Sequence, residues 1–532
     1  MISLTISLFM VKVNIFTIKA FTLGESRLSK PIQPVLVGAG QLIDRPSDLS
    51  KALNPLSMMQ ETAGLAAIDA GLFPDQLKNL DTLVVVNTVG PKLFANPPAA
   101  LARRLGAIHA EQFITSTGGN TPQSLVNTFA EDIARGRRSM VLLSGAEALD
   151  SQAKAAKTDF HLNWTEDESG CPKPDLLWPE RTGSNDVERA HGMVAPIVTY
   201  PLFENALRHN MGISVKEHQL AIGELFAAFT ELARDNPFAW FPTQRSAEEI
   251  ATPTPVNRYI GFPYTKYMNA VMQVNQSASV LLTSDVKASQ LGIDESRWVY
   301  LHGHCDVSEI WHVSERIDFH SSPALEAGLA SVFEMAGTTV DEINHFDVYS
   351  CFSAVLEVTR KALGMTPDDP RLLTVTGGLP YFGGAGNNYS MHAIATMMDR
   401  LRSAPGERGL VTANGWYLTK HALGIYSAMP PESPFRPQDP ATLKNLVSAM
   451  NHPTFDPHAQ GAATIETYTV MFDRSGSPQS GLVIGCLNNG SRFVALTPSD
   501  RHLLEQMTIH DPIGQKGRVT NGKPTSLFEF SL

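Results

Sequence analysis

The sequence predicts a layered α/β protein built from two related halves. Short apolar runs rich in β-branched residues alternate with amphipathic segments, which is typical of strands and helices around a largely parallel or mixed sheet. A helix ending in glycine, a short acidic linker and a buried strand then occur twice, about half a chain apart. With 532 residues the chain is also too long for one compact core, so we expect two to four domains.

The first half shows this alternation in order. Residues 35–40 (VLVGAG) predict a buried strand, and residues 55–71 predict a helix. A strand at 83–86, a helix at 121–135 and a strand at 140–143 follow. The VLVGAG run lacks the G-x-G-x-x-G spacing of a dinucleotide-binding loop, so we expect no nucleotide site there.

The second half repeats the first. Gly71 and Gly337 each end a predicted helix, and ten positions later Asp81 and Asp347 each lead into a strand. This order alone is common in any α/β protein. The next unit, however, also occurs twice, as a Gly/Asn-rich loop and helix at 118–135 and 383–400 and a strand at 140–143 and 409–412. Two copies of one unit are therefore the more economical interpretation.

Composition shifts predict where the domains begin and end. The stretch at about 150–263 is irregular and rich in Pro, Trp and His, as expected of a loop domain inserted in the first half. Alternation at 464–472 and 481–494, with Asn488-Asn489-Gly490 at a hairpin turn, predicts a small β-rich domain. The predicted parts are an extension (1–30), the first half with its loop domain (31–290), the second half (291–430) and a C-terminal domain (431–532).

The N-terminal extension is apolar, but Lys12 and Lys19 interrupt it and no small-residue cleavage site follows. It is shorter than a membrane-spanning helix, and no other segment is apolar enough to span a membrane. We interpret residues 1–30 as lying outside the fold, with a misassigned start as one explanation.

Charge and cysteine content exclude several classes of protein. A net charge of -11 leaves no basic excess for nucleic acid, although a local basic patch could still hold one small anion. The four cysteines are widely spaced without a C-x-x-C pair, which argues against a disulfide framework and suits a reducing cytoplasm. His302 and His304 lie on one face of a predicted strand, but no third ligand stands at metal-binding spacing, so we expect no metal site.

Several short motifs resemble those of the thiolase superfamily. Residues 347–353 (DVYSCFS) resemble the HDCFS segment of sterol-carrier-type thiolases and the NEAF segment of others. Residues 377–385 resemble the GGL…GHP stretch, residues 413–415 stand where those enzymes carry C-x-G, and residues 111–147 match the segment around their nucleophile. The resemblance covers about 32–427. The C-terminal domain resembles that of thiolase-like proteins of type 1, which fit the whole chain best.

This resemblance implies a duplicated thiolase fold with two αβ halves in α-β-α-β-α layers, an inserted loop domain and a small β-rich C-terminal domain. At the matching catalytic positions, however, the reactive groups are mostly replaced. The nucleophilic cysteine falls on Asn120, the GHP histidine on Gly384 and the C-x-G cysteine on Ala413. Tyr349 stands where the HDCFS segment has histidine, and Cys351 alone is retained.

The replacement at Asn120 decides the chemistry at that position. A thiolase nucleophile is a thiolate whose pKa is lowered at a helix N-terminus, and an asparagine cannot form an acyl-thioester. Asn120 is therefore either a simple N-cap of the following helix or an amide that donates to a thioester carbonyl. Acyl transfer through a covalent intermediate at this position is excluded.

Cys351 is the remaining candidate nucleophile or base, and His392 is the group we would test first as its partner. Equally, Cys351 could be an inert buried thiol, and His392 could face solvent or core. Asn387, Asn388 and Asn414 lie in glycine-rich loops and are candidate donors to a thioester, although tight turns need the same residues. The predicted catalytic residues are Cys351 and His392, and the predicted substrate-binding residues are Asn120, Asn387, Asn388, Asn414 and Gly384. Lys420 and His421 are expected at the surface.

From this resemblance we expect a protein that acts on or binds acyl-CoA thioesters, as an acyltransferase similar to acetyl-CoA acetyltransferases without the usual cysteine. Lipid metabolism would be its setting. The substrate would pass through a tunnel between loop domain and core toward Asn120, Cys351 and Asn387, with no cofactor beyond the coenzyme A thioester itself. The alternative is a non-catalytic acyl-CoA binder whose C-terminal domain recruits a partner.

Overall fold

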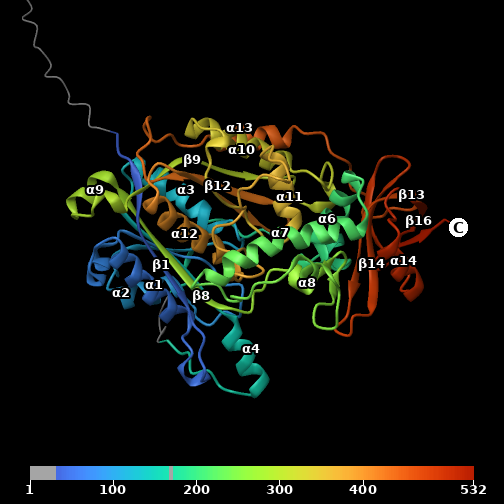
Figure 1. The fold of residues 1–532 in the computed structure, drawn as a ribbon, viewed down its shortest axis with the longest axis horizontal. Coiled ribbons are helices and arrows are strands. Elements are labelled where there is room, and N and C mark those ends of the chain that lie inside the picture. Colours follow the sequence, from blue (N-terminus) through green and yellow to red (C-terminus); the bar gives the residue numbers. More distant parts are fainter. Residues whose placement is uncertain (1–30, 167–171, 532) are drawn as a thin grey trace, which may run out of the picture. The chain divides into compact units, whose positions relative to one another are not determined.

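The computed structural model describes residues 31–166 and 172–531, so the predicted extension at 1–30 and Cys171 lie outside the described residues. A ten-stranded sheet runs through the thiolase-like part (Figure 1). In sheet order its strands are β10 (His345–Asp347), β11 (Arg408–Gly415), β12 (Lys420–Ser427), β9 (Val299–Ser308), β1 (Pro34–Ile43), β8 (Asn275–Ser284), β4 (Met140–Ala148), β2 (Thr82–Val85), β3 (Glu111–Ile114) and β5 (Asp175–Leu176).

The order of these strands confirms the duplication. The halves join where β1 pairs with β9. Outward from this join, the first half has β1, β8, β4 and β2, and the second half has β9, β12, β11 and β10. In each series the first strand begins the half and the second strand ends it. The third strand follows the helix after the Gly/Asn-rich loop, and the fourth follows the helix that ends near Gly71 or Gly337. The first strand runs antiparallel to the second in both halves, and the third and fourth run parallel to each other in both. Two copies of one αβ unit therefore build the sheet.

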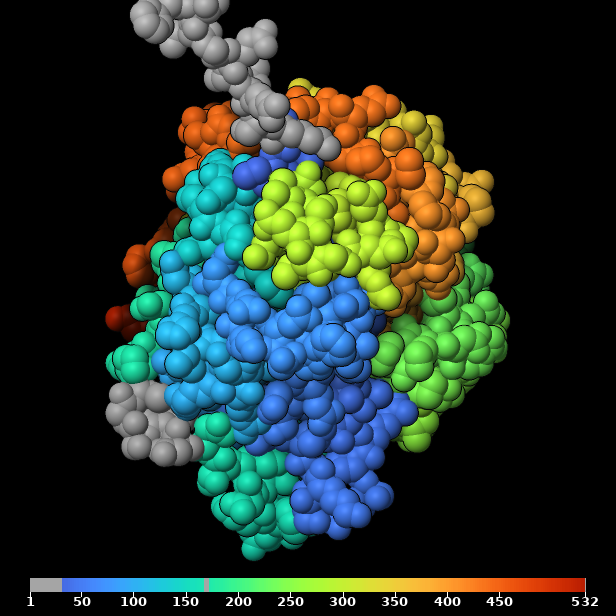
Figure 2. Space-filling model, turned by 90° about the vertical axis from the view of Figure 1, so that its left-hand side faces the viewer, coloured from blue at the N-terminus to red at the C-terminus, as the bar shows by residue number. Residues whose placement is uncertain are grey.

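Two helices lie between the halves, and others cover the outer faces. Helices α3 (Thr121–Ala134) and α12 (Tyr389–Ser403) contact each other and strands of both halves. Helix α1 (Pro55–Asp69) covers β1, β8 and β4, and α10 (Pro323–Ala336) covers β9 and β12. Figure 2 shows the outer face of the first half, where the blue segments lie beside α9 (Asp285–Gln290). This arrangement is the predicted α-β-α-β-α layering.

The glycines of the VLVGAG strand explain how closely α1 packs on β1. A Cβ built at Gly38 would lie 2.0 Å from the Ala66 carbonyl oxygen, and one at Gly40 would lie 2.1 Å from that of Thr62. Val35 and Val37 face α1, while Leu36 faces the core around α3. The glycines therefore allow α1 to pack closely on β1.

The segment between β4 and β8 contains two long helices and three short ones joined by loops, so the prediction that it is irregular is wrong where those helices lie. Its prolines misled the sequence reasoning, because Pro196 occupies the first turn of a helix, where a proline costs little, and Pro201 is accommodated inside the same helix. The elements of this segment are α4 (Leu149–Thr158), α5 (Asp186–Ala190), α6 (Pro196–Met211), α7 (Val215–Asp235), α8 (Ala247–Ala251), β6 (Tyr259–Gly261) and β7 (Tyr264–Thr265).

A second sheet lies at the C-terminal end of the chain (Figure 1, red). Five of its strands pair in the order β14, β15, β17, β16 and β13, and they form a closed ring because β14 also pairs with β13. Strand β6 extends the sheet by pairing with β13. The predicted turn at Asn488-Asn489-Gly490 joins β14 to β15, with Gly490 at φ 86°. The bounds are α13 (Pro440–Ser448), β13 (Gly461–Phe472), β14 (Pro478–Leu487), β15 (Arg492–Leu496), α14 (Arg501–Ile509), β16 (Lys516–Thr520) and β17 (Leu527–Phe530).

Two further helices complete the thiolase-like part, α2 (Pro97–Leu105) and α11 (Ser353–Ala362). Within the described residues, no helix has the length and apolar character needed to cross a membrane.

Candidate functional site

The loop before α3 meets loops of the second half, as the sequence predicts. The Gly118 amide donates to Asn387 Oδ1 at 3.0 Å. A Cβ built at Gly119 would lie 2.1 Å from Tyr349 Oη and 2.6 Å from the Asn414 carbonyl oxygen. Segments separated by more than two hundred residues are thus in direct contact here, and only glycine fits between them.

Asn120 occupies the N-cap position of α3, but its side chain makes no capping hydrogen bond. Its backbone is already helical, with φ -74° and ψ -18°. The Asn120 Nδ2 group donates to Ser124 Oγ at 3.1 Å, and Ser124 Oγ donates to Asp306 Oδ1 at 2.5 Å. Asp306 also accepts from Asn127 Nδ2 at 2.8 Å. This chain of donors orients the Asn120 amide, and within the described part of the chain the buried Asn120 Oδ1 has no hydrogen-bond partner.

Lys420 lies beside that unpartnered oxygen. A Cβ built at Gly118 would lie 2.4 Å from Asn120 Oδ1 and 2.6 Å from Lys420 Nζ, so those two atoms are at most 5.0 Å apart. Gly415 leaves room on the other side, because its Cβ would lie 2.9 Å from Lys420 Cε. The Lys420 ammonium donates to the Thr117 carbonyl at 2.7 Å. Two glycines therefore make the space in which Lys420 reaches the start of α3.

The expectation that Lys420 and His421 lie at the surface is wrong. Lys420 is partly buried, and burial lowers its pKa to about 8, although the nearby Glu180 carboxylate favours the charged form. His421 is 3% exposed, its Nε2 atom lies 3.1 Å from the Leu418 carbonyl oxygen, and burial lowers its pKa to about 4. Both residues open β12, which is covered on both faces.

The turn between β11 and β12 holds Lys420 in this position. Trp416 and Leu418 adopt left-handed backbone angles, with φ 58° and 54°. Such angles cost about 1–3 kcal/mol each in residues other than glycine and persist only where other contacts enforce them. Tyr200 supplies those contacts, because its hydroxyl donates to the Trp416 carbonyl at 2.8 Å and accepts from the Leu418 amide at 3.2 Å. The strained turn therefore positions Lys420 at the start of α3.

Cys351 is buried close to these loops, just before α11, but its thiol is not activated. Asn414 Nδ2 donates to Tyr200 Oη at 2.6 Å and lies 4.0 Å from Cys351 Sγ. Burial raises the pKa of Cys351 to about 12, although the hydroxyl of Tyr200 partly offsets this effect. The thiol is therefore neutral at physiological pH, whereas a nucleophilic cysteine needs a thiolate.

The contacts of His392 are with residues other than Cys351. Its Nδ1 atom is 2.9 Å from Gln41 Oε1 on β1, and its ring packs on Phe382 with centroids 5.2 Å apart. Burial lowers the pKa of His392 to about 3. Among the described residues, no hydrogen bond joins His392 to Cys351. The geometry thus gives no support to His392 as the base for this thiol.

The predicted amide donors are engaged within the chain. Asn387 Nδ2 donates to the Asn87 carbonyl at 2.7 Å, and Asn388 Nδ2 donates to the Gly145 carbonyl at 2.8 Å. The Gly384 amide donates to a backbone carbonyl of the loop before β8. These groups join the two halves, and the Asn414 amide is likewise used on Tyr200. Their donors are committed to the fold.

A groove opens in front of Asn120. Two adjoining cavities of about 530 and 500 Å³ share six lining residues. Neither Cys351 nor Asn387 lines them, so this groove is not the expected tunnel at which Asn120, Cys351 and Asn387 meet. The shared residues are Asn120, Arg181, Asp306, Trp311, Lys420 and Pro440. We call this space the Asn120 groove. Arg181 and the adjacent residues 178–180 come from the segment between β4 and β8, so the groove runs between that segment and the core.

Exposed cationic side chains line the groove. The Arg181 guanidinium lies 3.9 Å from the centre of the Trp311 ring, and Lys444 lies on α13. Neither forms an ion pair with the described residues, whereas Arg135 and Arg137 pair with carboxylates of α3. The groove therefore offers positive charge on the exposed side chains of Arg181 and Lys444 and on the partly buried Lys420.

The C-terminal part of the chain and the whole fold both match known proteins. The family described as "Thiolase-like protein type 1 additional C-terminal domain" matches residues 442–523. The solved structure of a monomeric SCP2-thiolase-like protein type 1 from Mycobacterium smegmatis is 36% identical, with a TM-score of 0.81. The match covers 94% of this chain and 100% of that one.

This chain belongs to the SCP2-thiolase-like protein type 1 family.

More distant thiolase-fold proteins resemble it in fold alone. An Ltp2-ChsH2(DUF35) aldolase is 16% identical over 74% of this chain and 97% of that one, with a TM-score of 0.53. An acetyl-CoA acetyltransferase from Syntrophomonas wolfei is 14% identical over 75% and 100%, also with a TM-score of 0.53. No curated protein matches the chain.

In this thiolase-like protein type 1, sequence reasoning missed the charged residues of the groove. Asp306 lies far from every thiolase motif along the chain, Arg181 lies in the inserted segment, and Lys420 follows the C-x-G position by five residues. The one available signal was the Asn-Gly turn before Lys420, which brings the start of β12 back to the C-x-G position. His302 and His304, by contrast, have separate partners, the Met429 carbonyl and the Glu131 carboxylate.

Proposed function

We propose that this protein binds an acyl thioester of coenzyme A in the Asn120 groove and holds it without a covalent acyl-enzyme. The observation that carries the proposal is the position of the Lys420 ammonium, which lines the groove beside the residue at the thiolase nucleophile position. A thioester carbonyl that enters this space accepts a charge-assisted hydrogen bond from Lys420. Asn120 Oδ1, which is unpartnered, accepts from an amide N–H of the ligand.

The exposed cations of the groove suit the anionic part of such a ligand. Coenzyme A carries several phosphate charges, and Arg181 and Lys444 supply cations at exposed positions. The guanidinium of Arg181 stacks on Trp311, which fixes its plane for binding phosphate oxygens. Phosphates at these cations and the thioester beside Lys420 would place the pantetheine arm along the groove.

Acyl transfer through a protein-bound acyl group has no support in the geometry. Asn120 carries no nucleophile, and the Cys351 thiol is neutral, buried and outside the groove. We therefore do not extend to this chain the activity named for its distant fold relative, the acetyl-CoA acetyltransferase. The cytoplasmic location expected from the cysteine content stays a prediction.

A second candidate function is direct acyl transfer between two bound substrates, favoured by the protonation of Lys420. Burial lowers its pKa to about 8. About a tenth of the Lys420 side chain is then neutral at pH 7, so this amine can accept a proton from an attacking substrate. No covalent intermediate with the protein is needed for this route.

One experiment separates these functions. The protein is incubated with acetyl-CoA and a series of longer acyl-CoA thioesters, while binding, coenzyme A release and the intact mass of the protein are followed. Non-covalent binding without release supports the binder, and release without a mass change supports direct transfer. A covalent adduct that Cys351→Ala removes would refute both, and no binding to any thioester would refute the site.

The matched control is a pair of lysine substitutions. Lys420→Met removes the ammonium group from the groove but keeps the length of the side chain. We expect it to weaken acyl-CoA binding by about 10- to 100-fold, the range of a charge-assisted hydrogen bond. Lys216→Met, at an exposed position on α7, should leave binding unchanged.

A further inference from the structure

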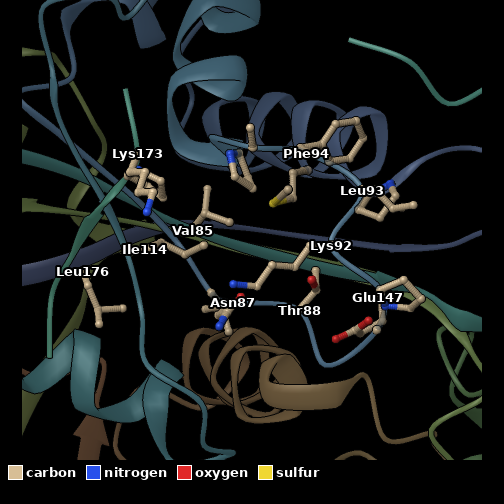
Figure 3. Close-up of a pocket in the computed structure, with 18 of the residues that line it drawn as sticks. Val85, Asn87, Thr88, Lys92, Leu93, Phe94, Ile114, Glu147, Lys173 and Leu176 are labelled. Atoms are coloured by element: carbon tan, nitrogen blue, oxygen red, sulfur yellow. The ribbon is translucent and has the colours of Figure 1, made fainter. Parts of the chain in front are cut away.

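A second cavity, of about 370 Å³, lies in the first half of the molecule (Figure 3). It opens at the carboxyl ends of the parallel strands β2, β3 and β4, and β5 and the starts of α1 and α2 complete its walls. None of its lining residues lines the Asn120 groove. It is therefore a separate space.

The internal duplication explains why this cavity resembles the site in the second half. At the Asn120 site, the start of α3 meets the ends of β10 and β11. At the second cavity, the start of α12 meets the ends of β2 and β4, which occupy the same places in the first half. Gly415 packs against the side chain of Asn120, and in the same way Gly145 packs against the side chain of Asn388. Asn387 then bonds to Asn87, and Gly386 packs against Glu147.

The sheet topology favours ligand binding at this place. The chain leaves β2 toward β3 on one side, and it leaves β4 toward β8 on the other. In open α/β sheets, loops that diverge in this way leave a crevice at the carboxyl ends of the strands, and ligands bind in it. Asn87 and Thr88 extend from β2 into this crevice, and Glu147 lies near the end of β4.

The lining combines an apolar floor with two lysines. The floor consists of Met59, Val85, Leu93, Phe94, Ile114 and Leu176. Figure 3 shows Lys92 and Lys173 on opposite sides of this floor, with Val85 and Ile114 between them. Both lysines are exposed, and neither forms an ion pair with the described residues. An anion with an apolar body is the ligand that satisfies both parts of the lining.

The protonation state of Glu147 controls how well the cavity accepts an anion. Its carboxyl group is 2% exposed and accepts from the Val89 amide at 2.6 Å. Burial raises the pKa of Glu147 to about 7, while the backbone amides of Val89 and Gly90 hold it lower than burial alone would. Below that pH the neutral carboxyl can donate to an anion, and above it the carboxylate repels one. Lys92 and Lys173 are the other ionisable lining groups.

We propose that this cavity is a second ligand site, separate from the Asn120 groove, which binds a small organic carboxylate with an apolar body. The carboxylate lies between Lys92 and Lys173, and the apolar body rests on the floor between α1 and β3. The site does not depend on the proposed acyl-CoA function, since the two spaces share no lining residue.

The test is a calorimetric titration of the full chain with octanoate, with octan-1-ol and octylammonium as probes of the same body and different charge. Octanoate should bind at least tenfold more tightly than either of the others. Lys92→Met/Lys173→Met should weaken octanoate binding at least tenfold, while the double variant Lys51→Met/Lys78→Met, at other exposed positions of the same half, should bind as the wild type does. Equal binding of all three probes, or no loss in the first double variant, overturns the proposal.

Two further variants complete the test. Lys420→Met should bind octanoate normally even if it no longer binds acyl-CoA, so that failure of one site is distinguishable from failure of the other. Octanoate binding should weaken as the pH rises from 6 to 8, and Glu147→Gln, which keeps an acceptor for Val89, should remove that dependence. Loss of octanoate binding in Lys420→Met, or unchanged pH dependence in Glu147→Gln, would contradict the assignment.

Discussion

Lys420 Nζ lies at most 5.0 Å from Asn120 Oδ1, at the start of α3, where the resemblance to thiolases predicts the nucleophile position. The two side chains come from positions 300 residues apart, and both line the same groove. A cation beside a neutral amide can polarise a carbonyl but cannot form an acyl-enzyme through the amide. This pair therefore distinguishes the site from that of a thiolase, and four predictions follow from its surroundings.

Asn120→Cys should create a reactive thiol. The new side chain would lie beside the Lys420 ammonium and at the N-terminus of α3, and both favour the thiolate. We expect its pKa to fall below the usual value of about 8.5. The rate of iodoacetamide labelling as a function of pH measures this value.

The control for this variant is Asn120→Cys combined with Lys420→Met, in which the labelling midpoint should move back toward higher pH. Peptide mapping should place the label on residue 120 while Cys351 stays unlabelled. An identical midpoint with and without the Lys420 ammonium would show that the two side chains do not interact.

Acyl-CoA binding should depend on pH through Lys420. Its pKa in the folded protein is about 8, lowered from 10.5 by burial, so the ammonium is present below pH 8 and lost as the pH rises through that value. We expect the Kd of an acyl-CoA to increase by about tenfold between pH 7 and pH 9.5, since a neutral amine is a weaker donor. Calorimetry at several pH values measures the trend, and in Lys420→Met the affinity should be independent of pH over this range. A tighter complex at the higher pH would contradict the role of the ammonium.

Cys351 should neither react with thiol reagents in the folded protein nor contribute to acyl-CoA binding. Its thiol is buried and its pKa is raised to about 12, so a thiol reagent such as Ellman's reagent should modify it only after unfolding. Cys351→Ala should change acyl-CoA affinity by less than twofold, because this residue does not line the groove. The exposed fraction of Cys486 is larger, so that residue serves as the internal control for labelling in the native state. Rapid native modification of Cys351 would restore it as a candidate nucleophile.

Gly119→Ala should destabilise the protein at the junction of its halves. The added Cβ would lie 2.1 Å from Tyr349 Oη and 2.6 Å from a backbone oxygen of Asn414, and overpacking of this kind costs about 1–3 kcal/mol. Denaturant unfolding gives the change in free energy.

The matched control is Gly64→Ala, at an interior position of α1 where a Cβ meets nothing within 4 Å. It should stabilise the protein by about 0.5–1 kcal/mol, because alanine favours the helix. Tyr349→Phe should recover part of the loss in the Gly119→Ala background by removing the hydroxyl oxygen. If Gly119→Ala proved neutral, the close contact between the halves would be wrong.

Much of the fold could be predicted from local patterns. Alternating apolar runs located the strands, and the recurrence around Gly71 and Gly337 revealed the duplication that the strand order confirms. The inserted segment was harder, because a proline such as Pro196 signals a loop in the sequence yet starts a helix in the structure. Strands β6 and β7 of that segment also join the C-terminal sheet, a pairing that no local pattern shows.

At the site, the sequence by itself determined that residue 120 is an asparagine, and the resemblance to thiolases predicts that this is the nucleophile position. Only the tertiary structure decided what surrounds that residue. Hydrogen-bond partners and burial depend on which distant segments meet, and the packing of the two halves brings Lys420 to Asn120 and seals Cys351 away from the groove. A pKa follows from those surroundings, so the ammonium of Lys420 and the inert thiol of Cys351 are properties of the folded chain.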